Sequence, residues 1–434
     1  MQIIGSTNQI TTNMKHQTKR KAEAMNDTQN GRGLKSGKSG FGRWTSALLA
    51  LTLCGSLSIR AQAAHGGQDT STIFQDTFET DVNGWMVIGP HGHIGTTNEI
   101  GKFKNGKSAL AFNYRFDVVA TNPGEIPIDA IIRPVMQGQL TKALSISFWA
   151  RSDTSAPFAI SLAEKDGGRY LAMVWLPKNQ WQHVVLTSAD FALTDGKDDP
   201  KDPDGKLDMD QVDSVSILNL WEFLSVSAKD NPAISAFFPP QTGEHTLWLD
   251  DFTASSAPPT YETPEPTLPV EKRGLWLDSL RRDTLSWLPM GMVEMQLDKM
   301  APTKARALRL DYTQEKGKLT AAVHDLKNVD LSKYDHLEFD VATSKPSKLL
   351  LTLEEKNGAR YVAIIDVAGN SMPSRKALYF SNFKLADDSP KDPDDKLDLD
   401  QLKNLSVVDL TAFFNMQTQP NTLWIGPIRA SQEK

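Results

Sequence analysis

Apolar and polar side chains alternate with a period of two along several short segments of this chain. Residues 146–151 and 158–162 follow this pattern, and so do residues 337–342 and 349–353. Because successive side chains of a β-strand point to opposite faces, this period predicts strands with one buried face. Gly, Pro, Asn and Asp separate the segments, as is typical of turns. The pattern predicts an all-β fold built from β-sandwich domains.

After its N-terminal region, the chain contains two copies of one domain. Residues 199–220 return as residues 389–410, with twelve of the 22 positions identical. Two further blocks recur in the same order: 164–173 with 355–364, and 246–249 with 422–425. Preserved order indicates an internal duplication and not a chance of composition.

A proline-rich segment separates the two copies. Residues 258–269 contain five prolines, a composition that favours an extended, semi-rigid spacer. We therefore expect a first module at 73–257, a linker at 258–272 and a second module at 273–432. Each module has the length of a single domain.

The N-terminal part of the chain has the pattern of an export signal. Residues 1–43 are polar and basic, residues 44–59 are largely apolar, and an A-x-A site ends at Ala63. These features predict that residues 1–63 are a basic n-region and signal peptide, cleaved near Ala63. The apolar run is too short for a transmembrane anchor, so we expect no stable membrane insertion. A lipoprotein anchored at Cys54 is the weaker alternative, because Leu53 is bulky for the position before a lipidated cysteine.

Composition excludes several other classes of protein. After residue 63 the chain carries 38 Lys and Arg against 51 Asp and Glu, which argues against a nucleic-acid partner. The one cysteine, Cys54, excludes a disulfide framework, and its loss with the signal peptide suits a periplasmic or extracellular protein. No nucleophile elbow, Cys–His pair, phosphate loop or nucleotide fingerprint is present, so we expect a protein that is not an enzyme. The oligomeric state stays open.

The first copy carries a series of short motifs in a fixed order. They are Phe78-Glu79 with Asn83-Gly84-Trp85, Trp181-Gln-His-Val-Val185, Gly205-Lys-Leu-Asp-Met-Asp-Gln211 and Leu247-Trp-Leu-Asp-Asp-Phe252. This series resembles the galactose-binding-like superfamily of jelly-roll domains, near carbohydrate-binding module family 11. The domain of complex I intermediate-associated proteins is similar too. In the second copy the resemblance covers residues 331–428.

The resemblance implies two tandem jelly-roll β-sandwich modules and a choice of functions. The first is an exported, non-catalytic protein that binds a polysaccharide or oligosaccharide, with the first module the better-equipped binder. The second is a structural or assembly protein that holds a protein partner through the same sandwich. A β-sandwich glycoside hydrolase or lyase is the weakest of the three. Fold alone does not decide between them.

The resemblance also implies a structural Ca²⁺ in the first module. Its ligands would be Glu79 near the first strand and Asp250 or Asp251 on the last, since carboxylate oxygens suit Ca²⁺. The second copy has Gly426-Pro427 at the corresponding place, so we expect no such site there. The acidic loops at 198–205 and 387–398 do not fit an EF-hand, and two interpretations stay open: carboxylates that close turns, or a metal site.

Comparison of the copies singles out two tryptophans. Trp149 aligns with Asp340 and Trp175 with Asp366, whereas the intervening apolar positions stay apolar. A sandwich core does not exchange Trp for an unpaired charge, so we expect both indoles outside the core. On one sheet they would form an exposed platform for sugar rings. The alternative is that a loop or the other module covers them.

Two further residues are candidates for ligand binding. Arg151 lies two positions after Trp149, on the same face of the predicted strand. Tyr170 follows a Gly-rich hairpin turn together with Arg169. The pair recurs as Arg360-Tyr361, so it fits a structural contact as well as a ligand contact.

Overall fold

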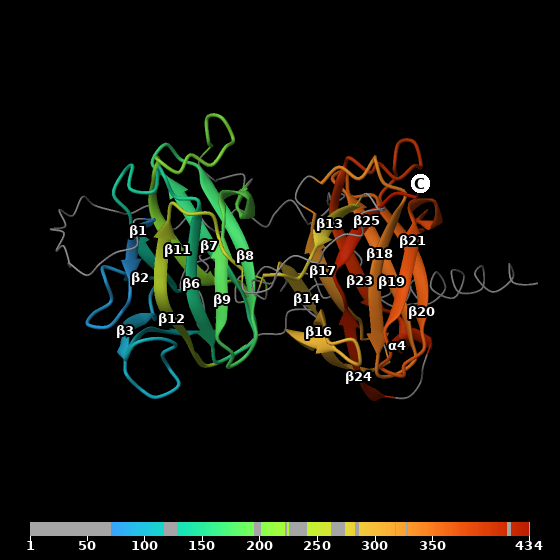
Figure 1. Ribbon diagram of the computed structural model, residues 1–434, viewed down its shortest axis with the longest axis horizontal. Helices are drawn as coiled ribbons and strands as arrows, with labels where there is room; N and C mark the ends of the chain where they lie inside the picture. The colour runs from blue at the N-terminus through green and yellow to red at the C-terminus, as the bar shows by residue number, and fades with distance from the viewer. Residues whose placement is uncertain are drawn as a thin grey trace, which may run out of the picture.

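The computed structural model describes residues 71–116, 128–194, 201–221, 224, 241–261, 274–282, 286–316, 318–326, 329–414 and 418–433. The predicted signal peptide and most of the predicted linker lie outside the described residues. The described chain is almost entirely β-strand, and it forms two domains placed side by side (Figure 1). The all-β prediction is confirmed, and so is the tandem arrangement.

The first domain is a sandwich of two antiparallel sheets. One sheet has the order β3-β4-β12-β6-β9, with β1 paired to β12: β3 (His93–Thr97), β4 (Ala109–Arg115), β12 (Glu244–Ser255), β6 (Ser145–Ser152), β9 (Gln182–Leu186) and β1 (Thr72–Asp76). The other has the order β10-β8-β7-β11-β5-β2: β10 (Ala192–Leu193), β8 (Arg169–Leu176), β7 (Ala156–Glu164), β11 (Val212–Asn219), β5 (Ala130–Pro134) and β2 (Met86–Ile88). A 3₁₀ turn, η3 (Ser188–Asp190), precedes β10.

The second domain repeats this architecture. One sheet has the order β13-β25-β18-β24-β16-β15, with β21 paired to β18: β13 (Gly274–Asp278), β25 (Ile428–Ser431), β18 (His336–Thr343), β24 (Gln419–Ile425), β16 (Ala305–Gln314), β15 (Val293–Met300) and β21 (Ser374–Tyr379). The other has the order β14-β17-β23-β19-β20-β22: β14 (Trp287–Met290), β17 (Thr320–Asp325), β23 (Leu402–Asp409), β19 (Ser347–Glu355), β20 (Arg360–Val367) and β22 (Lys384–Leu385). The short helices are η4 (Phe380–Asn382) and α4 (Thr411–Phe414).

The register of the strands confirms that the two domains correspond residue by residue. In the first domain Arg151 of β6 lies opposite Trp248 of β12. In the second domain Ala342 of β18 lies opposite Trp424 of β24. The long strand β12 continues through a bulge after Asp250, whereas its counterpart is divided into β24 and β25. The scaffold is thus the same, and differences between the copies are differences in side chains.

The period-two pattern produces the core of each sandwich. In β6, Ile146, Phe148 and Ala150 are buried between the sheets, while Trp149 and Arg151 on the other face are partly exposed. Burial of apolar area at roughly 25 cal/mol per Å² is the main term that stabilises such a core. Alternation along the strands also fixes which residues remain on the outer faces, where a ligand can reach them.

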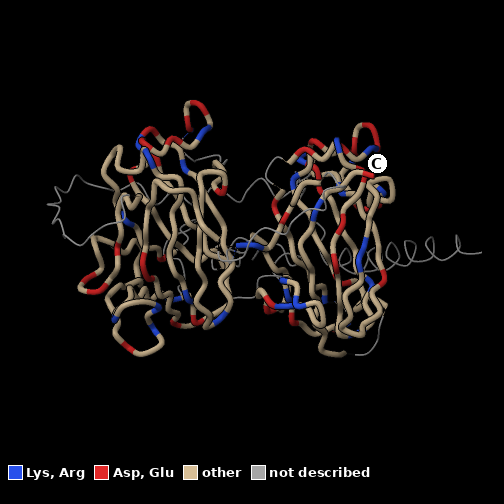
Figure 2. The backbone as a smooth tube through the Cα atoms, viewed as in Figure 1, with Lys and Arg blue, Asp and Glu red and all other residues tan. Residues whose placement is uncertain are grey.

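The acidic loops use their carboxylates to close turns. Figure 2 shows Asp and Glu gathered at the upper end of each domain. In the first domain Asp202 accepts the backbone N–H groups of Asp204 and Gly205 at 2.9 and 3.0 Å. Glu164 accepts the N–H of Asp208 from beneath the loop. In the part of the chain that the structure describes, no group of three or more His, Cys, Asp or Glu is placed to hold a metal ion. These contacts favour the structural interpretation.

The second domain covers part of the first. Trp175 of β8 points away from its own sandwich, is 2% exposed, and donates from Nε1 to the backbone oxygen of Met295 at 2.9 Å. Gln180 donates to Gln296, also on β15, at 2.6 Å. The buried apolar residues of the two domains form one continuous cluster. The edge strand β15 therefore packs against the outer face of β8.

Replacement of Trp175 by Asp, the residue at the equivalent position 366, should separate the domains. The interface would lose the indole and gain a carboxylate without a partner, a loss of about 3–5 kcal/mol by analogy with buried Trp truncations. Small-angle X-ray scattering should show a larger radius of gyration, and proteolysis within 258–272 should be faster. Each sandwich should keep its fold, because Trp175 lies outside its core. Asp366→Ala, at an exposed carboxylate, is the matched control, and an unchanged radius for Trp175→Asp would contradict the contact.

Glu164 should make stability depend on pH. Burial raises its pKa from 4.5 to about 7, and the carboxylates of Asp202 and Asp166 add to the shift. Between pH 4.5 and about 7 the folded protein holds a proton that the unfolded chain has released, so the free energy of unfolding should fall as the pH rises. Glu164→Gln should reduce that slope in urea unfolding at pH 5 and pH 7. Glu244→Gln, at an exposed position, is the control. A wild-type slope in Glu164→Gln would refute this assignment.

Candidate ligand-binding groove

A groove of about 380 Å³ lies on the outer face of the first domain, across β3, β4 and β12. The second domain does not line it. Its walls combine backbone and short polar side chains with one indole: His93, Ile94, Gly95, Thr96, Thr97, Glu99, Lys102, Ala111, Asn113, Thr246 and Trp248. Its size lies within the range of sites that hold small molecules or segments of a polymer.

Trp248 forms the floor of the groove. It lies on β12 between Leu247 and Leu249, which point into the core, so its indole faces outward. The ring is 6% exposed because Lys102 extends over it, with Nζ 4.0 Å from the ring centroid. The guanidinium of Arg151 approaches the same ring at 5.5 Å. An aromatic floor is thus covered by two cationic side chains.

Polar groups occupy the neighbouring positions of the sheet. The Thr246 hydroxyl donates to Asn113 Oδ1 at 2.8 Å, across the β4–β12 pair. His93 lies opposite Asn113 in the β3–β4 pair and is exposed. Hydroxyl, amide and imidazole groups in one row provide both donors and acceptors toward the groove.

Trp149 lies beside the groove on β6, opposite Asp250 of β12. Its ring stacks on His183 of β9, with the centroids 4.7 Å apart, and Lys104 Nζ lies 4.1 Å from its centroid. The indole is partly exposed and points away from the core, but two side chains already contact it. A ligand reaches this ring beside Lys104 or by displacing it.

The expected platform of Trp149 and Trp175 is wrong. Trp149 lies on β6 and Trp175 on β8, and these strands belong to different sheets. Trp175 is outside the sandwich core, as the comparison of the copies predicts, but β15 covers it. A buried indole whose N–H is already paired offers no surface to a sugar. The alternative, cover by the other module, is the arrangement found for Trp175.

Tyr170 is not available to a ligand either. It is buried, and its hydroxyl donates to the Asp202 carboxylate at the base of the acidic loop. Tyr361 makes the same contact with Asp392 in the second domain. A contact retained in both copies indicates that Tyr170 fixes the loop, and the ligand interpretation of this residue is wrong.

Arg151 remains at the groove. One guanidinium nitrogen donates to the backbone oxygen of Gly101, and another lies 3.4 Å from Asn179 Oδ1. Its Nε is buried and has no hydrogen-bond partner among the described residues. Neutral acceptors therefore position Arg151 beside Trp248, and its Nε–H donates no hydrogen bond to a described residue.

The three residues suggested for Ca²⁺ contact one loop at different residues, and in the described structure their carboxylates do not form a group of three around one position. Both Glu79 oxygens accept the backbone N–H of Lys107, at 3.0 and 3.1 Å. Asp250 Oδ2 accepts the backbone N–H groups of Lys104 and Asn105 at 2.7 and 2.8 Å. Asp251 contacts the Asn105 side chain at 2.6 Å. The structure therefore brings Glu79, Asp250 and Asp251 to the loop 104–107 from different directions.

Asp250 is the buried member of this set. Burial raises its pKa above the ordinary value, and the nearby Asp251 carboxylate adds to that effect. Its Oδ1 is buried and has no hydrogen-bond partner among the described residues. A carboxylate in this condition favours a proton or a cation.

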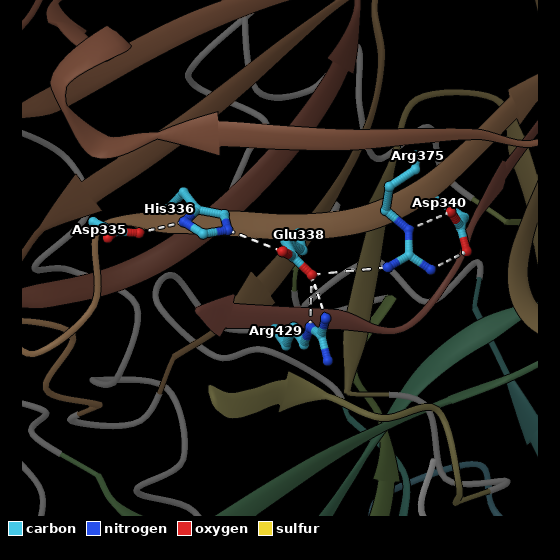
Figure 3. Close-up of polar contacts among 6 residues, drawn as sticks. All are labelled: Asp335, His336, Glu338, Asp340, Arg375 and Arg429. Carbon is cyan, nitrogen blue, oxygen red and sulfur yellow. Dashed lines mark hydrogen bonds and ion pairs between the residues drawn. The ribbon is translucent and has the colours of Figure 1, made fainter. Parts of the chain in front are cut away.

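The corresponding face of the second domain is occupied by ion pairs. Figure 3 shows Arg375 facing Asp340, with Nε and Oδ1 2.6 Å apart. On the same strand, β18, Glu338 accepts from Arg429, and His336 lies between Glu338 and Asp335. Although burial opposes protonation, the two carboxylates raise the pKa of His336. The positions of the stacked Trp149 and His183 in the first domain thus hold the Asp340–Arg375 ion pair in the second.

The comparison of the copies does not single out Trp248, because Trp424 occupies the same position in the second copy. The signal that identifies it is local. Thr246, Trp248 and Asp250 alternate with Leu247 and Leu249, which places the indole on the outer face. A residue shared by both copies can still differ in its surroundings, and only the fold brings Lys102 and Arg151 to this ring.

Comparison with known proteins adds three similar solved structures. One is a family 11 carbohydrate-binding module of a Clostridium thermocellum cellulosomal cellulase, at 18% identity, covering 37% of this chain and 97% of that chain, with a TM-score of 0.30. Another is a tandem of family 22 modules from Paenibacillus barcinonensis, at 10% identity, 86% and 100% coverage and a TM-score of 0.25. The third is a family 30 module of a cellulosomal cellulase from Clostridium thermocellum, at 15% identity, 33% and 88% coverage and a TM-score of 0.26.

No protein-family model matches the sequence, and no curated protein matches it. No helix in the described part of the chain is long and apolar enough to cross a membrane. Family 11, which the sequence resembles, is among the families of the similar structures.

Proposed function

We propose that this protein is an exported, non-catalytic polysaccharide-binding protein whose first domain holds the glycan in the groove over Trp248. The observation that carries the proposal is the combination of an indole floor with a row of hydrogen-bonding side chains in one open groove. A sugar ring has an apolar face and a rim of hydroxyl groups, so it matches an aromatic surface flanked by donors and acceptors. The signal-like residues 1–63 support export.

The carboxylates of the groove support a role in binding over catalysis. Glycoside hydrolysis usually needs two carboxyl groups that flank the scissile bond. Among the described residues that line the groove, Glu99 alone carries a carboxylate. Asp250 lies nearby but is buried, and one of its oxygens is committed to backbone N–H groups. This arrangement suits a site that retains a chain without cleaving it.

Trp248→Ala should weaken polysaccharide binding by about 2 kcal/mol, a typical value for a central aromatic contact. Affinity electrophoresis of the protein through gels that contain neutral or anionic polysaccharides would measure the change, and a reducing-sugar assay would detect cleavage. Trp424→Ala is a matched control, because it removes the equivalent indole from the second domain. His93→Ala, at an exposed edge position, tests the groove without altering the core.

Three outcomes would contradict this proposal. The wild-type protein could migrate unretarded through every gel. It could bind, with Trp248→Ala and His93→Ala retarded as strongly as wild type. Release of reducing ends by the wild-type protein would show an enzyme and not a binding protein.

We propose in addition that the first domain takes a structural Ca²⁺ at Glu79 and Asp250, with Asp251 adjacent. The unpartnered Asp250 Oδ1 supports this, because a cation would neutralise a carboxylate that burial leaves at a cost. Gly106 has a φ of 61°, and a Cβ there would meet Glu79 Oε1 at 1.8 Å. Glycine therefore allows the loop to approach the Glu79 carboxylate closely.

Calcium should stabilise the protein through these carboxylates. An ion that binds only the folded state raises the melting temperature by mass action. We expect a higher melting temperature in about 1 mM Ca²⁺ than in EDTA. This concentration is about 100 times a dissociation constant of about 10 µM. Asp250→Asn should remove most of that response, and Asp366→Asn, at an exposed carboxylate of the second domain, should keep it. Equal melting temperatures with Ca²⁺ and EDTA, or a full response in Asp250→Asn, would contradict this site.

A further inference from the structure

The outer face of the first domain carries three cations that lack a carboxylate partner among the described residues. Lys102 extends over Trp248, and Lys104 extends over Trp149, at 4.0 and 4.1 Å from the ring centroids. Arg151 approaches Trp248 from the neighbouring strand, β6. All three lie at or beside the groove. The aromatic rings hold these charges in place without neutralising them.

The hydrogen bonds of Arg151 also leave its charge unpaired. Its guanidinium contacts the backbone oxygen of Gly101 and the side-chain oxygen of Asn179, both of which are neutral. Its Nε has no partner among the described residues although it is buried. The unused Nε–H, together with an N–H of a terminal nitrogen, can donate to the two oxygens of an anionic group, which is the contact that Arg makes best.

Carboxylates lie at and near the groove as well as cations. Glu99 is the one carboxylate among the lining residues that the structure describes, and it is exposed. Asp250 lies beneath Lys104 and accepts its backbone N–H, with that of Asn105. None of these carboxylates pairs with the side chain of Lys102, Lys104 or Arg151 in the described structure, so the three side chains remain available to an anionic ligand.

The second domain supplies an internal comparison. At the corresponding face its arginines are paired with carboxylates: Arg309 with Asp298 at 3.0 Å, Arg375 with Asp340 at 2.6 Å, and Arg429 with Glu338. The register makes one exchange explicit. Trp149 lies opposite His183 in β6–β9, and Asp340 lies opposite Arg375 in β18–β21. The corresponding faces thus carry different cations, which are paired with carboxylates in the second domain and have no such partner among the described residues of the first.

The overall negative charge of the chain bears on how an anionic ligand could bind to these cations. After residue 63 the acidic residues outnumber the basic ones by 13. A polyanion would be repelled by the protein as a whole. Binding of a polyanion therefore requires a specific cationic site, and nonspecific attraction does not produce it.

We propose that the groove binds an anionic polysaccharide, one whose sugar units carry carboxylate or sulfate groups. This inference rests on the function proposed above and names its ligand class. Lys102 and Arg151 pair with the acidic groups of the glycan, and Lys104 pairs with a neighbouring unit beside Trp149. When Lys102 turns toward an anion, the Trp248 ring becomes free to contact the sugar. Charge recognition and ring stacking are then produced by one movement of one side chain.

The experiment compares matched polymers on the whole protein. Affinity electrophoresis would use alginate as the uronate, carboxyl-reduced alginate as its neutral counterpart, a sulfated galactan, and a neutral β-glucan. We expect retardation by one of the two anionic polymers at 20 mM NaCl and at least a tenfold weaker interaction with every neutral polymer. Retardation should fall at 200 mM NaCl, because salt screens exposed charges. The uronate and sulfate gels distinguish the two sources of the anion.

Variants assign the charge to the groove. Lys102→Gln and Arg151→Gln should each weaken the anionic interaction at least tenfold, and Lys104→Gln should weaken it less. Lys348→Gln, at a half-buried lysine of the second domain that pairs with Asp366, is the control and should bind as wild type does. Circular dichroism checks that each variant is folded.

The outcomes separate this inference from the function on which it rests. Equal or stronger retention by neutral polymers would overturn the anionic ligand and leave polysaccharide binding intact. Retention by an anionic polymer with the Lys102→Gln and Arg151→Gln variants unaffected would also overturn it. Absence of retention by any polymer would reject polysaccharide binding itself, and the inference with it.

Discussion

The contact between Trp175 and Met295 determines which surfaces of this protein a ligand can reach. A β-sandwich has two outer faces, and an apolar side chain on either face must be covered or exposed to water. Where the two domains meet, Trp175 is covered, and its indole N–H donates to the backbone oxygen of Met295 on the edge strand β15. The sheet that contains β3, β4, β12 and β6 is left as the outer face with the groove. Domain packing therefore covers Trp175 and leaves the face with the groove open.

The duplicated scaffold then shows how side chains alone divide the roles. Both domains keep an outward Trp at the same register, Trp248 and Trp424. Beside Trp424, Arg309 forms ion pairs with acidic neighbours. Lys102 lies over the Trp248 ring and has no carboxylate partner among the described residues. An exposed ion pair contributes little to stability, but it does consume the charge of both partners. A domain whose surface charges are already paired has little to offer a charged ligand.

The sequence predicts much of the fold because the evidence for strands is local. Alternation along β6 and β8 places Trp149 and Trp175 outside the core, and the exposed Asp366 at the position equivalent to Trp175 agrees with that direction. The sheet to which each strand belongs is a long-range property, so the sequence does not reveal that the two tryptophans lie on different sheets. Cover of Trp175 by another domain is equally invisible to a periodicity. Tyr170 shows a third limit of prediction from sequence. The repeat includes the loop that contains Asp202, but it does not reveal that Asp202 contacts Tyr170.

The asymmetry of charge also bears on why the tandem exists. Two linked binding modules gain avidity only when both sites engage the same polymer. Here the second domain holds Asp340 and Arg375 where the first has Trp149 and His183, so its face keeps Trp424 but lacks the second indole. Its observed contribution is structural: it buries Trp175 and joins the two apolar cores. The fold is thus common to both copies, while the outer faces differ in the residues that a ligand would meet.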